Sequence, residues 1–528
     1  MNGKAYKGSI TIFLSLACIL FLALICAVTE SARVQGAKAQ SANITGMGTF
    51  SLLSEFEPKL LEKYEIFSLD GASGGSFRIQ TVNYRLEEFL TRNASPKSGL
   101  LMSLTFDPWN LELESCEITG YALLTDDKGE AFYQQAVAYM KANVGVIALE
   151  ELLKLANSTE EIEENQEAYE TSQDSNDGEL SGLEEEKQEK LEELEELESE
   201  SSGSGSSESE ASGGESSESG SSGSESDKSA SDQETGNPLT EIAKLRRKST
   251  LEIVTWDKTL SEKSVSLNQQ PSKSSLRSGS LDLEAEHSGL VSNVLFREYL
   301  MRFFPNFVSG EAGASLDYQL EYILGGKATD ENNLKYVVNR LLLVREGMNY
   351  AFGVSNATMN SQAGALATTL TGFLGIPALT EATKHALLLA WSYGESLVDV
   401  RILLDGGKVP LAKDESSWSL TLENLGRVTE VLKAGAEDKE EGLSYQDYIR
   451  VLLNMGNLSN QKMRALDLIQ AAMRQEEGMS GFQVQNCIVG VAASATYQCG
   501  QVFWGLPAAV LGASGGQLTF TQTADMAY

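Results

Sequence analysis

Histidine and cysteine are scarce in this chain of 528 residues, which has two histidines and five cysteines. Zinc sites need clusters of such side chains, and neither the H-E-x-x-H nor the C-x-x-C motif occurs. The two Gly-Gly-Lys tripeptides lack the G-x-x-x-x-G-K spacing of a phosphate-binding loop. We therefore expect no catalytic residue, no metal site and no cofactor, and we expect that the protein is not an enzyme.

Positive charge is also in short supply. The chain has 41 basic and 75 acidic residues, a net charge of −34. Residues 160–234 alone hold 27 acids and three lysines, so most of the acidity belongs to one segment. Binding to nucleic acid requires clustered basic residues, and no basic patch is present. Nucleic acid is therefore excluded as a partner.

The acidic segment divides into two parts. Residues 183–200 combine strong helix formers with three leucines at spacings of three, which is compatible with a short coiled coil. Residues 201–226 contain no apolar side chain except Ala211, so they cannot bury enough surface to offset the entropy lost on ordering. We expect residues 158–236 to form an acidic linker rich in Ser, Gly and Glu that is mostly disordered.

The longest apolar run lies near the N-terminus, where the 19 residues from Ile10 to Val28 carry no charge. At about 1.5 Å per helical residue the run spans roughly 30 Å, the thickness of a bilayer core, whereas the apolar part of a secretory signal is about 7–15 residues long. Two lysines precede the run, which places the N-terminus in the cytoplasm and the bulk of the chain outside. We expect residues 1–35 to be the cytoplasmic tip and transmembrane helix of a single-pass cell-membrane protein. The alternative is a signal peptide cleaved near Gln40.

Two folded regions flank the linker. In residues 36–157, apolar and polar side chains alternate at 77–82, 101–106 and 111–119, which predicts strands, and the pattern turns helical at 130–157. This first region is expected to be a small α+β unit outside the membrane. The overall fold class that we predict is α+β.

The second region, residues 285–528, is predicted to be mainly helical with strands at its end. A short ordered segment, expected to be a helix followed by a strand, and a connector precede it at 237–284. Within it, residues 316–324 end at two glycines and residues 329–352 begin at a capping threonine, a pattern that favours a helical hairpin. Ser444 and Asp447 are predicted to form a capping box at the start of a later helix.

An uncharged stretch at residues 362–379 raises the alternative of a second membrane span. Its length is borderline, and it contains threonines, glycines and Pro377. These residues favour a buried helix followed by a turn.

The densest group of charged and aromatic residues lies at 390–420. Glu395 and Asp399 share one face of an otherwise apolar helix, one turn beyond Trp391. Buried carboxylates can serve acid/base catalysis because burial raises their pKa. A buried charge must also be paired, and a structural pairing is the interpretation that we favour. The basic residues near enough in sequence to fold back onto the two acids are Arg401, Lys408 and Lys413.

Cysteine offers one structural possibility. Cys487 and Cys499 are expected on neighbouring strands, and a disulfide between them would persist outside the cell. Cys116 is then left over, and Cys18 and Cys26 lie in the apolar run.

Several segments together resemble a known family. They include "LEYILGGKATDENNLKYVVNRLLLVREGMNY", "AWSYGESLVDVRILLDGGKVPLAKDESSWSL" and "GLSYQDYIRVLLNMGN". The family consists of uncharacterised membrane-anchored proteins of anaerobic Gram-positive bacteria and is described only as a domain of unknown function. The resemblance implies a shared architecture and brings no established activity.

The N-terminus, "KGSITIFLSL", resembles that of the pseudopilin-type proteins of tight-adherence (Tad) pilus systems. Those proteins begin with a basic residue and a glycine before their membrane helix, and the resemblance implies a possible processing site between Gly8 and Ser9. The resemblance is to the TadE/TadG-like proteins of these systems. Phe13 stands where pilins cut by the peptidase usually carry glutamate, so the anchor is more similar to that of the larger TadG-like members than to that of the major pilin.

These observations lead to one principal expectation and two alternatives. We expect a structural or accessory protein of a Tad-like pilus or another cell-surface assembly, with the membrane and other envelope proteins as partners. The first alternative is an extracellular ligand-binding or sensor protein that uses the 390–420 region. The second is a cell-envelope hydrolase that uses Glu395 and Asp399.

Overall fold

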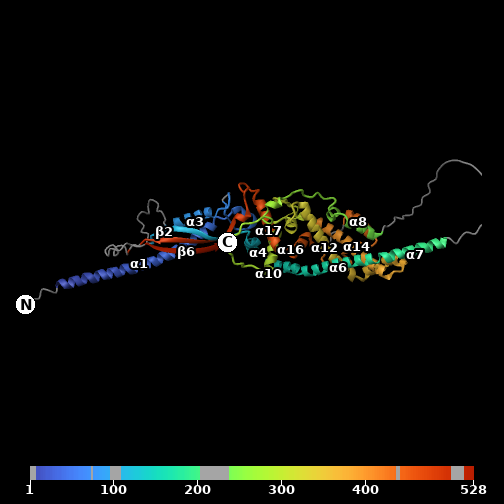
Figure 1. The fold of residues 1–528 in the computed structure, drawn as a ribbon, viewed down its shortest axis with the longest axis horizontal. Coiled ribbons are helices and arrows are strands. Elements are labelled where there is room, and N and C mark those ends of the chain that lie inside the picture. Colours follow the sequence, from blue (N-terminus) through green and yellow to red (C-terminus); the bar gives the residue numbers. More distant parts are fainter. Residues whose placement is uncertain are drawn as a thin grey trace, which may run out of the picture.

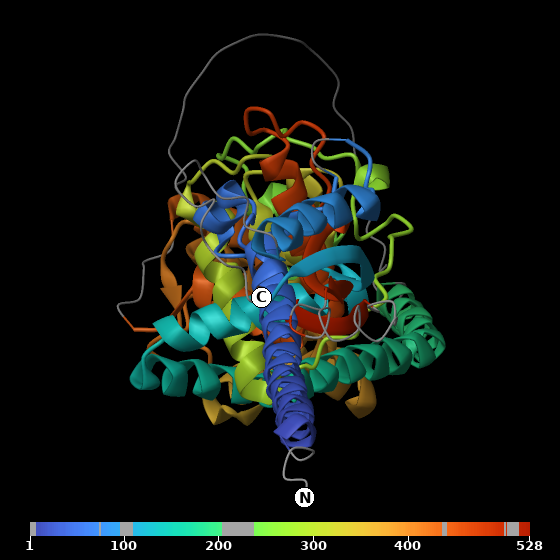
Figure 2. The ribbon, with the colours of Figure 1, turned by 90° about the vertical axis from the view of Figure 1, so that its left-hand side faces the viewer.

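The computed structural model covers the whole chain and describes residues 7–72, 75–94, 109–202, 237–435, 441–500, 503 and 517–528. An antiparallel sheet and helix α1 form one end of the molecule, and a larger helical body forms the rest (Figure 1). The view along α1 shows that this helix projects from the sheet end, with the helical body behind it (Figure 2). The mixed helix and strand composition confirms the predicted α+β class.

Helix α1 runs without interruption from Lys7 to Leu53, over 47 residues. Its side chains from Ile10 to Val28 are almost all exposed, although most are apolar. Beyond this run one face becomes buried at spacings of three and four, with Ala37, Ser41 and Ile44 among its members. In the part of the chain that the structure describes, α1 is the one helix long and apolar enough to cross a membrane.

The sheet combines strands from both ends of the chain. Its central strand is β5 (Cys487–Cys499), which pairs antiparallel with β2 (Leu111–Leu123) along one edge. Along the other edge it pairs with β6 (Leu518–Ala527) and with the two-residue β1 (Leu69–Asp70). The expectation of two separate regions is therefore corrected, because a C-terminal strand completes the sheet of the first region.

The predicted strand at residues 77–82 is wrong. The segment opens helix α3 (Ile79–Ala94), whose buried residues Val82, Leu86 and Leu90 recur every four positions and pack with α1 over the sheet. The strand was predicted from alternation over only six residues, a window too short to show the helical period of the whole segment. The strand predicted at 101–106 lies outside the described residues, and the one predicted at 111–119 is confirmed as part of β2.

The helical body surrounds one continuous hydrophobic core. Its central helices are α12 (Asp330–Ser355) and α14 (Pro377–Leu404), which pack against each other over much of their length. Besides two helices of the acidic segment, described below, the other α-helices are α2 (Pro58–Tyr64), α4 (Asp126–Asn143), α5 (Val146–Asn157), α8 (Pro238–Arg246), α9 (Thr250–Val254), α10 (Gly289–Phe303), α11 (Gln319–Gly325), α13 (Ala357–Thr371), α15 (Val428–Ala434), α16 (Tyr445–Met455) and α17 (Leu458–Met473). The described residues also form five short 3₁₀ turns, at 267–269, 307–309, 372–374, 425–427 and 484–486, and the strand pair β3 (Lys408–Val409) and β4 (Leu443–Ser444).

Local sequence signals explain several helix ends. The predicted hairpin is confirmed as α11 and α12: α11 stops at Gly326, whose φ of 62° suits glycine, and Thr329 caps α12 by accepting a hydrogen bond from the Asn332 N–H. The capping box of Ser444 and Asp447 is present at the start of α16. The strand expected after the first helix of 237–284 is replaced by the short helix α9.

The acidic segment is more ordered than predicted. Helices α6 (Thr159–Gly182) and α7 (Glu184–Ser202) cover its first half, and α6 packs along α12 and α14. The buried residues Ile162 and Tyr169 hold α6 in place, and the Tyr169 hydroxyl bonds Glu346 Oε1 at 2.9 Å. The boundary at 158 is thus corrected, since α6 belongs to the helical body. Residues 203–236 lie outside the described residues.

The uncharged stretch at 362–379 is a helix followed by a turn, as predicted. Helix α13 ends at Thr371 and α14 begins at Pro377. Burial is confined to one face of α13, at Met359, Ala363 and Ala367, so the expectation of a buried helix holds for that face alone.

Candidate functional site

The two predicted carboxylates lie on α14 at the centre of the helical body. Glu395 and Asp399 are both fully buried. Lys413, from the loop that follows β3, reaches both: it bonds Glu395 Oε1 directly, and its Nζ lies 2.6 Å from Asp399 Oδ1. Backbone N–H groups of Ser419 and Leu420 donate to Glu395 at 2.9 and 2.7 Å. Every oxygen of Glu395 thus has a donor.

A second cation completes the cluster from α12. Arg345 Nε donates to Asp399 Oδ2 at 3.0 Å, and Asn349 donates to the same oxygen at 2.9 Å. The Nη1 of Arg345 is held by the carbonyl oxygens of Pro410 and Leu411 and by the Tyr448 hydroxyl. Two buried acids therefore face two buried bases, which is the pairing that burial of charge demands.

The two carboxylates differ electrostatically. Burial raises the pKa of Glu395 above its ordinary value, although Lys413 opposes the shift. Burial also acts to raise the pKa of Asp399, but Lys413 and Arg345 outweigh it and hold that pKa below its usual range. Two carboxylates whose pKa values differ in this way resemble an acid/base pair. Whether a substrate can reach them therefore decides between catalysis and structural pairing.

No cavity found in the described residues reaches the two carboxylates. The cavity beside them has a volume of about 280 Å³ and is lined by Trp391, Trp418 and their neighbours; neither Glu395 nor Asp399 is part of its wall. Trp391 is buried against Trp418 and donates from Nε1 to the Leu420 carbonyl. With both carboxylates enclosed and paired with cations, the arrangement is that of a structural ion-pair network that joins α12, α14 and the 410–420 loop.

The other predicted members of the cluster lie elsewhere. Arg401, two residues beyond Asp399 on α14, turns away and bonds Asp257 at 2.7 Å and Asp405 at 2.7 Å. Lys408 is exposed in β3. Of the three candidate bases, Lys413 alone folds back onto the acids. No sequence signal within 390–420 points to Arg345; of the two arginines in the 329–352 helix it is the one on the buried face, and its position among apolar residues is the signal that could have identified it.

The predicted disulfide is wrong. Cys487 and Cys499 are free and occupy the two ends of the same strand, β5. Twelve residues of extended chain separate their Cα atoms by about 40 Å, whereas a disulfide requires less than about 7 Å. The turn expected between two strands does not exist, because β5 continues through it.

The possible processing site lies at the beginning of α1. Gly8 and Ser9 are its second and third residues, so cleavage between them would leave the helix almost entire. In the residues that the structure describes, no group of His, Cys, Asp and Glu is arranged to hold a metal ion.

Comparison with known protein families yields a match over the C-terminal half of the chain. The model of a family of unknown function, DUF5702, matches residues 228–499. Comparisons with curated proteins and with solved structures gave no match. The matched range includes α8 to α17, the buried ion-pair network and the central strand of the sheet. Because it covers more than half of the chain, the protein belongs to the DUF5702 family.

Proposed function

We propose that the protein is a membrane-anchored, extracytoplasmic structural component of a Tad-like pilus or a related cell-surface assembly. The observation that carries the proposal is the division of α1 into two halves within one continuous helix. The first half presents an exposed apolar surface, and the second half supplies part of the core of the sheet unit. The resemblance of "KGSITIFLSL" to pseudopilin-type N-termini adds to it.

Burial along α1 favours retention of the anchor over removal of a signal peptide. Cleavage near Gln40 would delete Arg33 and Ala37, which are 5% and 0% exposed. It would also leave the side chain of Trp109 without Gly36, the residue against which it packs so closely that a Cβ at position 36 would lie 2.1 Å from the ring. A chain cut at that point would lose folded-state contacts, which a dispensable leader does not make.

The outer face of α1 supports a role in assembly. Met47 and Phe50 remain 58% and 62% exposed on the side turned away from the sheet. Between these two residues and the apolar run, the helix carries only small side chains at Ala39 and Ala42 and none at Gly46. Small residues permit close approach of a second helix, and burial of the apolar side chains would stabilise that contact. We therefore propose that the apolar helix of a neighbouring subunit packs against this face.

The two alternative functions, hydrolase and ligand-binding protein, differ in the support that they receive. A hydrolase that uses Glu395 and Asp399 has no open site at those residues, because both are enclosed and paired. A ligand-binding role draws support from a separate cavity, described below.

The topology is tested by protease treatment of intact spheroplasts, combined with N-terminal sequencing of the protein from the same cells. We expect degradation of everything beyond about residue 40 and an intact Met1. A start at Ser9 would indicate pseudopilin-type processing and is compatible with the proposal. A start near Gln40, or protection of residues 285–528, would contradict the anchor and its orientation.

The assembly role is tested by cross-linking in cells through single cysteines placed at Met47 and Phe50. We expect products with other subunits of the assembly. The matched control is a cysteine at Tyr84, which is 72% exposed but lies on α3 and not on α1. Equal yields at all three positions, or none at Met47 and Phe50, would count against the proposed contact.

A further inference from the structure

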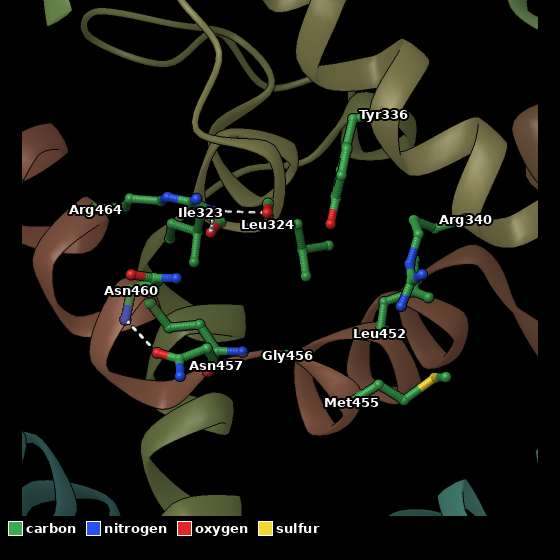
Figure 3. A pocket seen from close by; sticks show the side chains of 11 residues that line it. Ile323, Leu324, Tyr336, Arg340, Leu452, Met455, Gly456, Asn457, Asn460 and Arg464 are labelled. Carbon is green, nitrogen blue, oxygen red and sulfur yellow. Dashed lines mark hydrogen bonds between the residues drawn. The ribbon is translucent and has the colours of Figure 1, made fainter. Parts of the chain in front are cut away.

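A cavity of about 250 Å³ opens in the helical body, away from the buried ion-pair network. It lies between the end of α11, the middle of α12 and the turn from α16 into α17 (Figure 3). Tyr336 and Arg340 enter it from α12, and Asn457, Asn460 and Arg464 line the opposite side. This volume is below the roughly 300–1,000 Å³ of pockets for drug-sized ligands, so its occupant must be small.

The wall of the cavity is positively charged. None of the eleven described residues that line it is acidic, while two of them are arginines. In a chain of net charge −34 this is a local exception. Long-range steering of anions would be weak here, so any selectivity for an anion must come from contacts inside the cavity.

Arg340 is half-buried and aimed at the cavity beside Tyr336 (Figure 3). It forms no hydrogen bond or ion pair with any residue that the structure describes. A guanidinium carries five N–H donors and is always charged, so an unpaired one in a confined site is costly unless water or a ligand engages it. Arg340 is therefore available to a ligand.

Arg464 supplies the second charge, and its position is built into the fold. Its Nη1 donates to the carbonyl oxygens of Ile323 and Leu324 at 2.8 and 2.6 Å. The guanidinium rests on Gly326, where a Cβ would lie 2.6 Å from Cζ. Burial lowers the pKa of Arg464, which shows that its charge is partly desolvated.

The charge of Arg464 is not neutralised by these neutral carbonyl groups. Asp467, one turn further along α17, is bonded instead to Ser272 and to the Tyr322 hydroxyl. Two guanidinium groups therefore share one cavity whose other polar groups are a phenol and amides.

We propose that this cavity binds a small oxyanion, either a phosphate group or a carboxylate, through Arg340 and Arg464, with the Tyr336 hydroxyl as a further donor. Guanidinium groups match the geometry of both anions and form charge-assisted hydrogen bonds to them. The site lies within the region that matches the family. It adds ligand binding to a protein that we otherwise assign to a structural role, and it does not depend on that role.

The test is calorimetric titration of the full chain in a phosphate-free detergent, with inorganic phosphate and acetate in separate experiments. Sodium chloride keeps the ionic strength constant, because diffuse charge effects are screened equally by any salt. We expect saturable one-site binding of at least one anion. Binding of phosphate alone identifies a phosphate ligand, and binding of acetate alone identifies a carboxylate. Saturation with neither anion would overturn the proposal.

Variants locate the site. Arg340→Gln should weaken binding by about tenfold or more, because it removes a charged hydrogen bond. Tyr336→Phe, which keeps the ring and its packing, should weaken it less. Arg247→Gln is the matched control, since Arg247 is exposed at the end of α8 and its loss changes the net charge equally. Equal binding by the Arg340 and Arg247 variants would refute the site. If the Arg340 variant does not fold, unchanged binding by the Tyr336 variant would refute it.

Discussion

Arg33 and Glu30 form an ion pair one turn apart on α1, with 2.7 Å between Nη2 and Oε1. The same guanidinium donates to the carbonyl oxygens of Trp109 and Gly500, and Glu30 accepts a hydrogen bond from the Phe503 N–H. Trp109 precedes β2 and Gly500 follows β5. The pair therefore connects the end of the apolar run to the end of the sheet where β2 begins and β5 ends.

Arg33→Gln should destabilise the sheet unit by about 3 kcal/mol, because it leaves Glu30 buried without its counter-charge. Chemical denaturation of the full chain in detergent measures this change. Lys38→Gln, five residues further along the same helix and exposed, is the control and should cost less than about 0.5 kcal/mol. Equal effects of the two substitutions would show that the ion pair contributes nothing.

Asp399→Asn should destabilise the helical body by about 3–5 kcal/mol, since Arg345 and Lys413 would then share a single acid. Glu395→Gln should act in the same direction. Glu423→Gln, at an exposed position after the 410–420 loop, provides the control. A variant of either buried acid that keeps its stability but loses the cellular function would instead indicate a functional site.

Gly347→Ala should detach the acidic helix α6 from α12. A Cβ at Gly347 would lie 2.8 Å from the backbone nitrogen of Gln166, a contact that neither helix can relieve without moving. Limited proteolysis should then cut within residues 159–182 faster than in the unmodified chain. Gly353→Ala on the same helix meets nothing closer than 3.7 Å, and it should leave the cleavage rate unchanged.

Stability should fall as pH rises from about 4.5 to about 7, in part through Glu321. Burial raises the pKa of this residue to about 7, although the Tyr445 hydroxyl and the Phe307 N–H both bond it. The folded state then binds a proton that the unfolded state has released, which makes the slope of stability against pH negative in this window. The whole effect amounts to about 3 kcal/mol.

Glu321→Gln should remove that part of the pH dependence, which is measured as the difference between urea midpoints at pH 5 and pH 7.5. Glu311→Gln, exposed and in the loop just beyond Phe307, should retain it. Parallel pH profiles for the unmodified chain and the Glu321 variant would contradict the assignment.

The Cys487 thiol should resist alkylation in the folded protein, because burial raises its pKa to about 12 and so suppresses the reactive thiolate. After unfolding without reductant, both Cys487 and Cys499 should be alkylated, as free thiols are. Mass spectrometry of the peptides distinguishes this result from a disulfide, which would leave both cysteines unmodified.

Signals confined to one helix turn or one cap were predictable from the sequence. The stop at Gly326, the cap at Thr329 and the box of Ser444 and Asp447 depend on a few adjacent residues. The apolar length of α1 and the need to pair Glu395 and Asp399 were likewise local inferences. Lys413 could be named because it lies 18 residues from Glu395.

Features that depend on distant partners could not be predicted in this way. Arg345 meets Asp399 across 54 residues, and nothing near either one specifies the other. The acidic composition of α6 suggested disorder. In the structure α6 packs against α12, because its Tyr169 ring is buried and because Gly347 on α12 has no side chain to keep the two backbones apart. The long strand β5 was divided in two in the prediction, whereas the structure shows it continuous between β2 and β6.

The central position of β5 has a consequence for the timing of folding. Among the residues that the structure describes, β2 pairs with β5 alone, so its partner strand is absent until residues 487–499 have been synthesised, and β6 follows later still. Pairings of such sequence separation form slowly because a long loop must close first. The helical body lies between them in the chain and contains its own core, so it can fold while β2 still lacks β5. Exposed strand edges promote aggregation, which makes this interval the stage at which the chain is most prone to aggregate.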